Sequence, residues 1–280
     1  IPHPSTFNDD YKGRKAAKEA WMRIDGHMNR KDVKIKPPEG LSDDELIAWN
    51  KFGNEDGEFW TPDERMSDEE RKNWKFQRYI KDYLRCVKAA DDAIGEMLNY
   101  LDASGLSENT IVVYTSDQGF YLGEHGWFDK RFMYEESMHM PLLIRYPNMI
   151  QPGLVSDEMV LNIDFAPTLL DLAGVKAPKI FQGKSFSDLL KNESNTTFRD
   201  AVYYHYFEFP YWHHVQPHYG IRTNKFKLIH FYYSLNEWEF FDLENDPNEL
   251  NNLIENPAYE EVIKKLKVRL DELKKEYKMD

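Results

Sequence analysis

A polar loop with three glycines follows the apolar segment from Ile111 to Tyr114. In this loop Asp117 and Gln118 place a carboxylate beside an amide carbonyl, and such oxygen atoms suit a hard cation such as calcium. His125 and Lys130 add a titratable imidazole and a compact cation, the groups needed beside an anionic leaving group. The spacing alone leaves two interpretations open: a metal or anion site, and an ordinary surface turn.

Motifs stand in a fixed order on both sides of this loop. They are Ser116-Asp117-Gln118-Gly119, Leu122-Gly123-Glu124-His125-Gly126, Lys130, Tyr134-Glu135-Glu136-Ser137, Pro141-Leu142-Leu143-Ile144, Asp164-Phe165-Ala166-Pro167-Thr168-Leu169-Leu170-Asp171-Leu172-Ala173-Gly174, Gly183-Lys184-Ser185 and Phe241-Asp242-Leu243-Glu244-Asn245-Asp246-Pro247-Asn248-Glu249. From about Asp91 onward, the series closely resembles the second half of the formylglycine-dependent sulfatases, in the alkaline phosphatase superfamily. Within that family the sequence is most similar to bacterial enzymes that remove 6-O-sulfate from N-acetylglucosamine.

The resemblance implies both a fold and a site. The implied fold is α/β: part of a large sulfatase sheet flanked by helices, then a smaller C-terminal antiparallel sheet with a closing helix. Asp117 and Gln118 are implied calcium ligands, Lys130 is implied to contact the sulfate, and His125 is given a leaving-group or orienting role. Gln118 departs from the histidine or asparagine usual at its position, which implies a weaker metal site.

The nucleophile that the resemblance requires is missing. These sulfatases oxidise a Cys or Ser to formylglycine within a Cys/Ser-x-Pro/Ala-x-Arg motif, whereas Cys86 precedes Val87-Lys88-Ala89-Ala90 and no serine begins such a motif. We expect the chain to be the C-terminal part of a sulfatase and to be inactive by itself. Asp9 and Asp10 invite comparison with the family's early calcium-binding aspartates, but we expect them to be solvated loop residues.

Apolar periodicity predicts the elements that position the loop. The capping-box signature from Ser67 to Glu70 opens a helix with one buried face that runs to about Ala103 and includes Cys86 in the core. The other predicted helices are Tyr11 to Met28, Ser42 to Trp49, a segment opened by Asn162-Ile163-Asp164 and capped by Asp164, and Leu250 to Tyr277; the predicted strands are Ile111 to Ser116, Pro141 to Tyr146, Val202 to Phe207, Tyr219 to Arg222, Lys225 to Phe231 and Glu237 to Asp242. We assign residues 1–198 to the catalytic α/β domain and residues 199–280 to the antiparallel-sheet subdomain.

An aromatic and histidine-rich loop runs from Tyr211 to His218. We expect Trp212, His213 and His218 to bind substrate, because aromatic faces and imidazoles can hold a sugar ring. A zinc site is the alternative, but the ligand spacing fits a tetrahedral motif poorly. A plain surface loop is a second alternative.

Composition limits the partners. The net charge of −13 argues against nucleic acid as a binding partner. The sequence contains no run of 18 apolar residues, so it predicts no membrane-spanning helix. The same charge repels sulfated polymers, so local cations such as Lys130 and a bound calcium must attract a sulfated sugar. The resemblance favours a periplasmic or secreted protein, although the chain shows no signal peptide.

Two other functions stay open. One is a phosphodiesterase or phosphonate monoester hydrolase of the same superfamily, for whose metals Gln118 is a poor ligand. The other is a non-catalytic glycan-binding fragment. In either case we expect exposed edges of the core strands to favour self-association.

Overall fold

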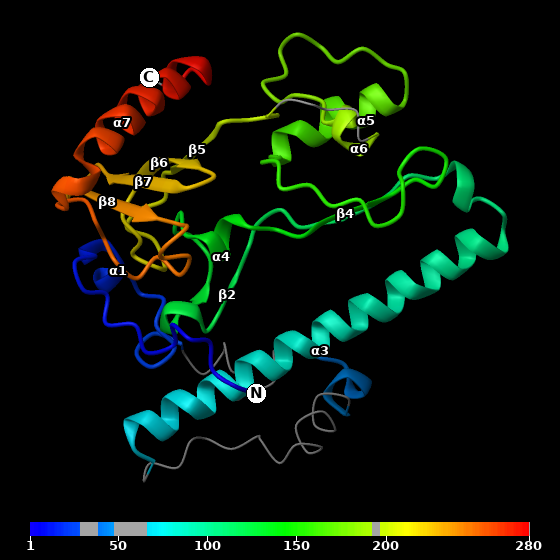
Figure 1. The fold of residues 1–280 in the computed structure, drawn as a ribbon. Helices are drawn as coiled ribbons and strands as arrows, with labels where there is room; N and C mark the ends of the chain where they lie inside the picture. The colour runs from blue at the N-terminus through cyan, green and yellow to red at the C-terminus, as the bar shows by residue number, and fades with distance from the viewer. Residues whose placement is uncertain (29–38, 48–65, 192–196, 280) are drawn as a thin grey trace.

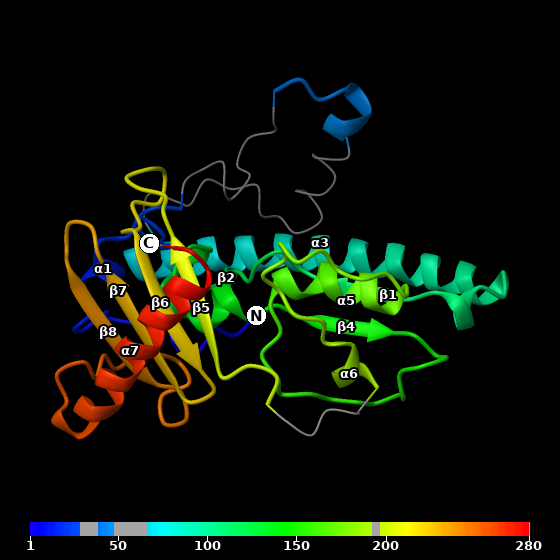
Figure 2. The same ribbon diagram turned by 90° about the horizontal axis from the view of Figure 1, so that it is seen from above.

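The structure is a computed structural model that describes residues 1–28, 39–47, 66–191 and 197–279. Its main elements, in chain order, are α1 (Lys15–Glu19), α3 (Asp68–Ala103), η1 (Ser107–Asn109), β1 (Val112–Thr115), β2 (Tyr121–Leu122), η2 (Glu124–Gly126), β3 (Phe128–Asp129), α4 (Glu135–Met138), β4 (Leu142–Arg145), η3 (Asn162–Asp164), α5 (Phe165–Leu172), α6 (Ser187–Leu190), β5 (Ala201–Tyr206), β6 (His218–Thr223), β7 (Phe226–Phe231), β8 (Glu237–Asp242), η4 (Pro257–Tyr259) and α7 (Glu260–Glu276). The chain is α/β, as predicted, with α3 along one side and the C-terminal sheet beyond one end of β4 (Figures 1 and 2).

Helix α3 is the longest described element and has the predicted length. Ser67 and Glu70 form both halves of a capping box, which satisfies amide groups at the helix start. The predicted buried face is correct only for the first half, where Phe76 and Ile80 are buried, because Val87 and Met97 farther along are exposed. Cys86 is also exposed, so its predicted place in the core is wrong.

Strands β1 and β4 form an antiparallel pair in which Tyr114 lies opposite Leu143. The sequence predicted core strands whose edges are left exposed in this chain. Tyr114 and Leu143 are 43% and 66% exposed, because among the described residues the pair makes up a sheet of only two strands.

The C-terminal sheet matches the prediction closely. Its strands pair in the order β5-β6-β7-β8, all antiparallel, and α7 covers one face of the sheet (Figure 1). The closing helix begins at Glu260 rather than at Leu250. The preceding segment follows β8 instead, because Leu253 and Asn252 bond to the backbone of Phe240.

The predicted helix from Tyr11 to Met28 is mostly wrong. Only α1 forms, because the residues after it pair with the central loop: Ile24 N–H donates to Gly126 C=O, and Met22 C=O accepts from Phe128 N–H. The predicted helix after Ser42 is present at residues 43–47, and its end at Trp49 lies outside the described residues.

One hydrophobic core joins both predicted domains. Trp127 and Phe132 of the central loop region are buried with Ala17 near the N-terminus and with Ile229 and Phe241 of the sheet. A second core lies between the sheet and α7, and a third lies under the first half of α3. The domain boundary between residues 198 and 199 stays a prediction.

Helix α5 begins where the sequence predicts. Asp164 accepts from Leu161 N–H at 2.8 Å and from Lys184 N–H at 2.8 Å, so it caps the preceding turn and ties it to a distant loop. The same carboxylate also forms a bidentate pair with buried Arg199. Asp164 is thus a structural anchor with more partners than the predicted cap.

Candidate active site

Three predicted site residues line a single cavity of about 490 Å³: Asp117, Gln118 and Lys130. Its wall comes from the loop after β1, the segment after β3, α4, the turn before α5 and strand β5; the lining includes Arg131, Ser137, Met138, Met140, Val160, Leu161, Asn162, Ile163, Gln182, Val202, Tyr203, Tyr204, Tyr206, Glu208, Tyr277 and Met279. The cavity therefore brings carboxylate and amide oxygens close to a lysine.

A larger cavity of about 730 Å³ shares part of this wall, including Met138 and Val202. Apolar side chains such as Leu142 and Ile150 dominate its lining, and Arg222 and Glu135 in its wall already pair with each other at 3.0 Å. None of the predicted site residues lines it. The candidate site is the smaller cavity because that is where the oxygen ligands and Lys130 meet.

The loop that carries Asp117 and Gln118 is packed against α4. Gly119 N–H donates to Ser137 C=O at 2.9 Å, and a Cβ at Gly119 would lie 2.0 Å from the carbonyl oxygen of Glu136. Only glycine allows so close an approach between the two backbones. Contact with α4 thus fixes the position of the two predicted metal ligands.

Lys130 lies between two residues with left-handed backbone angles. Asp129 has φ 72° and Arg131 has φ 121°, conformations that cost energy in non-glycine residues and often occur at functional sites. Asp129 binds His213 Nε2 at 2.8 Å and Arg131 at 3.3 Å. Burial would raise the pKa of Asp129, but the His213 hydrogen bond and the Arg131 charge lower it overall, so this carboxylate stays ionised.

Strand β5 and the segment after it add polar residues to the cavity wall that sequence reasoning missed. Tyr204 donates to the carbonyl of Arg131 at 2.9 Å, Tyr206 donates to Glu208 at 3.1 Å, and Arg131 Nε lies 3.7 Å from Glu208 Oε2. The available signal was the alternation of Tyr204 and Tyr206 on one face of a predicted strand. Nothing in the sequence placed that face beside Lys130.

His125 lies outside the cavity, in a buried ionic network. Its Nδ1 is 2.7 Å from Asp9 Oδ2, and its Nε2 is 3.7 Å from Glu136 Oε2. Burial would lower the pKa of His125, but hydrogen bonding to these carboxylates outweighs burial and raises it to about 9. The imidazole is therefore charged at neutral pH and holds two carboxylates together.

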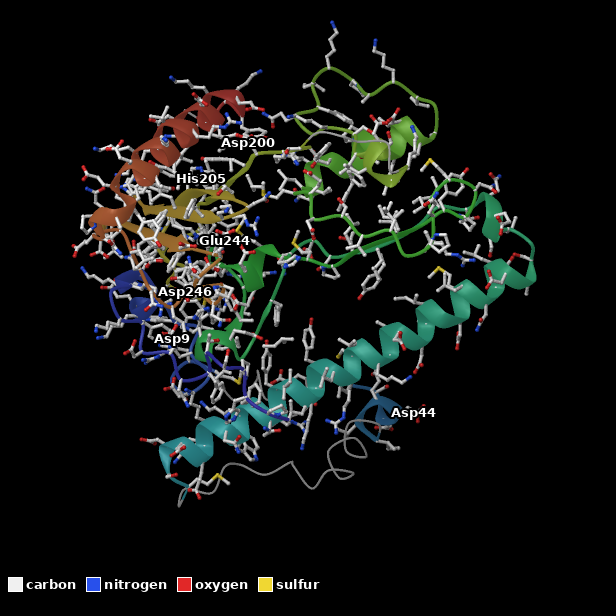
Figure 3. The ribbon with its side chains drawn as sticks, viewed as in Figure 1. Asp9, Asp44, Asp200, His205, Glu244 and Asp246 are labelled. Atoms are coloured by element: carbon white, nitrogen blue, oxygen red, sulfur yellow. The ribbon has the colours of Figure 1, made fainter. Side chains whose placement is uncertain are left out.

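The expectation that Asp9 is a solvated loop residue is wrong. Its side chain is 2% exposed and accepts from Arg14 at 2.5 Å as well as bonding to His125, so it is not a solvated loop residue. Asp10 is exposed, as expected. Figure 3 labels Asp9 below α1. No local sequence pattern indicates the pairing of Asp9 with His125, because the two residues lie 116 positions apart.

The three predicted sugar-binding residues have different surroundings. Trp212 is 75% exposed, and His213 binds Asp129, the residue before Lys130, at 2.8 Å. His218 is fully buried on β6, with Nδ1 2.7 Å from the carbonyl of Gln216, and burial lowers its pKa to about 4. Its ring packs behind Tyr204 and Tyr206, which line the cavity, so His218 supports the wall rather than facing it.

Family models match most of the chain. The model described as "Sulfatase" matches residues 2–175, and "N-sulphoglucosamine sulphohydrolase, C-terminal" matches residues 123–276. The chain belongs to the sulfatase family.

Known relatives agree with this assignment. The sulfatase chain is 46% identical over 296 residues to an N-acetylglucosamine-6-O-sulfatase from Bacteroides thetaiotaomicron, covering 99% of this chain and 53% of the relative. It matches, with 43% identity and a TM-score of 0.91, a solved structure in complex with its substrate D-glucosamine-2-N,6-O-disulfate, covering all of this chain and 60% of that one. The sulfatase chain thus spans about half the length of the relatives it matches.

A phosphonate monoester hydrolase of Agrobacterium radiobacter shares the fold, with a TM-score of 0.63, 23% identity, and coverage of 74% of this chain and 47% of that one. Identity at that level supports the architecture but no activity. The fold class implied by the motifs, that of the alkaline phosphatase-like sulfatases, is confirmed.

Asp117 and Gln118 fit part of a calcium site. Their oxygens suit the cation, but calcium takes about six to eight oxygen ligands. Within residues 1–28, 39–47, 66–191 and 197–279, no group of three His, Cys, Asp or Glu side chains could hold a metal ion. Asp117 and Gln118 therefore remain predicted calcium ligands.

Within the described ranges, no helix is long and apolar enough to cross a membrane.

Proposed function

We propose that this chain forms part of a sulfuric ester hydrolase that acts on sulfated sugars, with 6-O-sulfated N-acetylglucosamine as substrate. The observation that carries the proposal is the cavity in which Lys130 lies with Asp117 and Gln118. The high identity to an N-acetylglucosamine-6-O-sulfatase supports the choice of sugar. We place the enzyme in the periplasm or outside the cell, where sulfated glycans are encountered.

In this proposal the chain's own residues bind and orient the sulfate ester. Lys130 neutralises charge on the sulfate oxygens, and Asp129 and Arg131 hold the lysine's backbone in place. Asp117 and Gln118 contribute oxygen ligands to calcium, which supplies further charge neutralisation when bound. The sequence lacks a Cys/Ser-x-Pro/Ala-x-Arg motif, so the formylglycine nucleophile comes from outside these 280 residues.

The test uses the protein expressed from the complete gene. Lys130→Ala should lower kcat for a sulfated N-acetylglucosamine by about 10²-fold or more, because one contact to the developing charge is lost. Lys225→Ala is the matched control, since Lys225 is exposed and pairs with Glu244. Turnover by Lys130→Ala within twofold of the control would refute the role of Lys130.

Metal content tests the second part of the site. Asp117→Ala should lower the calcium content of the purified protein and remove the calcium dependence of its turnover, because a carboxylate ligand is lost. Unchanged metal content would contradict the assignment of Asp117.

Trp212 and His213 remain proposed sugar-binding residues. Substituting either by alanine should raise KM for a sulfated hexosamine more than for a small aryl sulfate, because only the sugar can use their rings. Equal changes for both substrates would assign the loop a structural role, which the bond between His213 and Asp129 already gives it in part.

A further inference from the structure

The face of the C-terminal sheet that α7 covers is covered only in part. Ala201, Ile221, Leu228 and Phe240 are buried beneath α7 in the second hydrophobic core. Farther along the same face, aromatic and histidine side chains remain half-buried. These residues, which we call the outer aromatic surface, are Tyr203, His205, Tyr219, His230, Tyr232 and Trp238. They come from all strands of the sheet, and Figure 3 labels His205 among them.

Hydrogen bonds and ring contacts fix this surface. His205 lies 2.9 Å from Tyr203 Oη and 3.2 Å from Tyr232 Oη, and His230 lies 2.9 Å from Tyr219 Oη. The rings of His230 and Trp238 stack at 4.1 Å. Because the side chains are already ordered, a ligand would bind without the cost of immobilising them.

Two lysines of α7 stand over the rings. Lys267 Nζ is 4.3 Å from the centre of the Trp238 ring, and Lys274 Nζ is 4.8 Å from the centre of the Tyr219 ring. They lie two turns apart on the helix and so share one side of it. Asp271 lies between them in the sequence and its charge also acts on Tyr219, so one carboxylate offsets part of the charge of the two lysines on a chain of net charge −13.

The charges of these lysines also affect the pKa values of the two histidines. Burial first, and then the charge of Lys274, lower the pKa of His205 below its usual range. Burial also lowers the pKa of His230; the hydrogen bond to Asn236 opposes this shift, and the charges of Lys267 and Lys274 add smaller contributions to it. At neutral pH the positive charge of the surface therefore comes from the lysines.

The surface is continuous with the candidate active site. Tyr203 belongs to the outer aromatic surface and also lines the Lys130 cavity, and Tyr277, which stacks against it at 6.3 Å, lines the cavity too. From β5 the surface extends across the sheet to β8, a span of about 14 Å at the usual strand spacing. A chain of linked sugars can cross such a distance, whereas a single sugar cannot.

We propose that the outer aromatic surface is a distal binding site for a sulfated oligosaccharide whose terminal sugar occupies the Lys130 cavity. The inference rests on the proposed function and adds that the enzyme binds a polymer chain. Aromatic faces pack against sugar rings, the phenol and imidazole groups bond to hydroxyls, and the two lysines pair with sulfate groups beyond the terminal sugar. The lysines favour a sulfated chain over a neutral one.

Binding of two ligands by the 280-residue chain tests this site. The ligands are 6-O-sulfated N-acetylglucosamine and a sulfated hexasaccharide that ends in the same sugar. Lys267→Ala with Lys274→Ala should weaken hexasaccharide binding, measured by calorimetry, by about tenfold or more, and should leave binding of the monosaccharide unchanged. Lys264→Ala with Lys275→Ala removes the same charge from exposed positions of the same helix and should change neither affinity by more than about twofold.

Other outcomes would overturn the proposal. Equal weakening by both double variants would indicate unspecific attraction, and equal affinity for a desulfated hexasaccharide would remove the role of the lysines. If the unmodified chain formed dimers that the Lys267 and Lys274 variant could not form, the surface would be an interface between copies. An unchanged thermal midpoint confirms that each variant is folded.

A separate assay distinguishes this proposal from the proposed function. In the protein from the complete gene, the Lys267 and Lys274 variant should hydrolyse a small aryl sulfate as fast as the unmodified protein. If the unmodified protein hydrolyses no sulfate ester, the proposed function fails while the binding result stands. If hydrolysis is normal and hexasaccharide binding is unaffected by the variant, only the distal site fails.

Discussion

The imidazole of His125 is enclosed by the carboxylates of Asp9 and Glu136, and these neighbours determine its chemistry. Its backbone is equally constrained: His125 has φ 53°, its N–H donates to Thr6 Oγ1, and its carbonyl accepts from Tyr11. A charged pair inside a protein contributes little when whole but costs several kcal/mol when one partner is removed. His125 is thus an ionic clamp between the N-terminal segment and α4, the helix on which the Asp117 loop rests.

This clamp makes the stability of the chain depend on pH. The folded-state pKa of His125, about 9, lies above its ordinary value of 6.5, so its contribution is complete below pH 6.5 and is lost as the pH rises through 9. The shift corresponds to about 3 kcal/mol. Between pH 6 and 10, the free energy of unfolding should therefore fall by about 3 kcal/mol more in the unmodified chain than in His125→Gln, as measured by urea denaturation.

An exposed histidine supplies the control for this measurement. His139→Gln should keep the full pH dependence of the unmodified chain, because His139 is exposed and its side chain lies outside the network. A His125→Gln profile parallel to that of the unmodified chain would show that the imidazole does not hold a proton in the folded state.

At the scale of elements, close packing of the backbone positions the site. The Asp117 loop rests on α4 through Gly119, and α4 is held in turn because Glu135 N–H donates to buried Glu249 at 2.7 Å and Lys227 pairs with both carboxylates. The predicted metal ligands, Asp117 and Gln118, are therefore held in position from the C-terminal sheet.

Gly119→Ala tests this arrangement. The new Cβ would lie 2.0 Å from a backbone oxygen that cannot rotate away, so the loop must shift and the free energy of unfolding should drop by roughly 1–3 kcal/mol. Gly95→Ala is the matched control, since Gly95 lies in α3 with open space around it and alanine there should stabilise the helix by up to about 1 kcal/mol. Similar free energies for the two variants would contradict the contact between the loop and α4.

Local patterns predicted the elements well and their surroundings poorly. The capping box at Ser67 and the alternation along β5 depend on neighbours a few residues apart, so the sequence displays them. For the site, residue types and motif resemblance selected Asp117, Gln118 and Lys130, which line one cavity, while their roles stay predictions. The pairing of Asp9 with His125 and the approach of Tyr204 to Arg131 join distant segments, which no local pattern records.

At the scale of the whole molecule, apolar surface remains exposed away from the C-terminal sheet. Tyr114 and Leu143 lie opposite each other in the β1–β4 pair and so point to the same face, where they are 43% and 66% exposed. Along α3, Val87, Met97 and Tyr100 are also exposed. Exposed apolar faces and strand edges of this kind promote association between chains.

We therefore expect the 280-residue chain to self-associate through the β1–β4 pair. Light scattering after size-exclusion chromatography should give a mass that rises with concentration, and Tyr114→Glu with Leu143→Lys should restore the monomer, because opposite charges across the pair preserve strand pairing while making the face polar. Val268→Lys, at an exposed position of α7, should leave the association unchanged. A monomeric mass for the unmodified chain at every concentration, or association unaffected by the charged pair, would show that the exposed strands are not the contact.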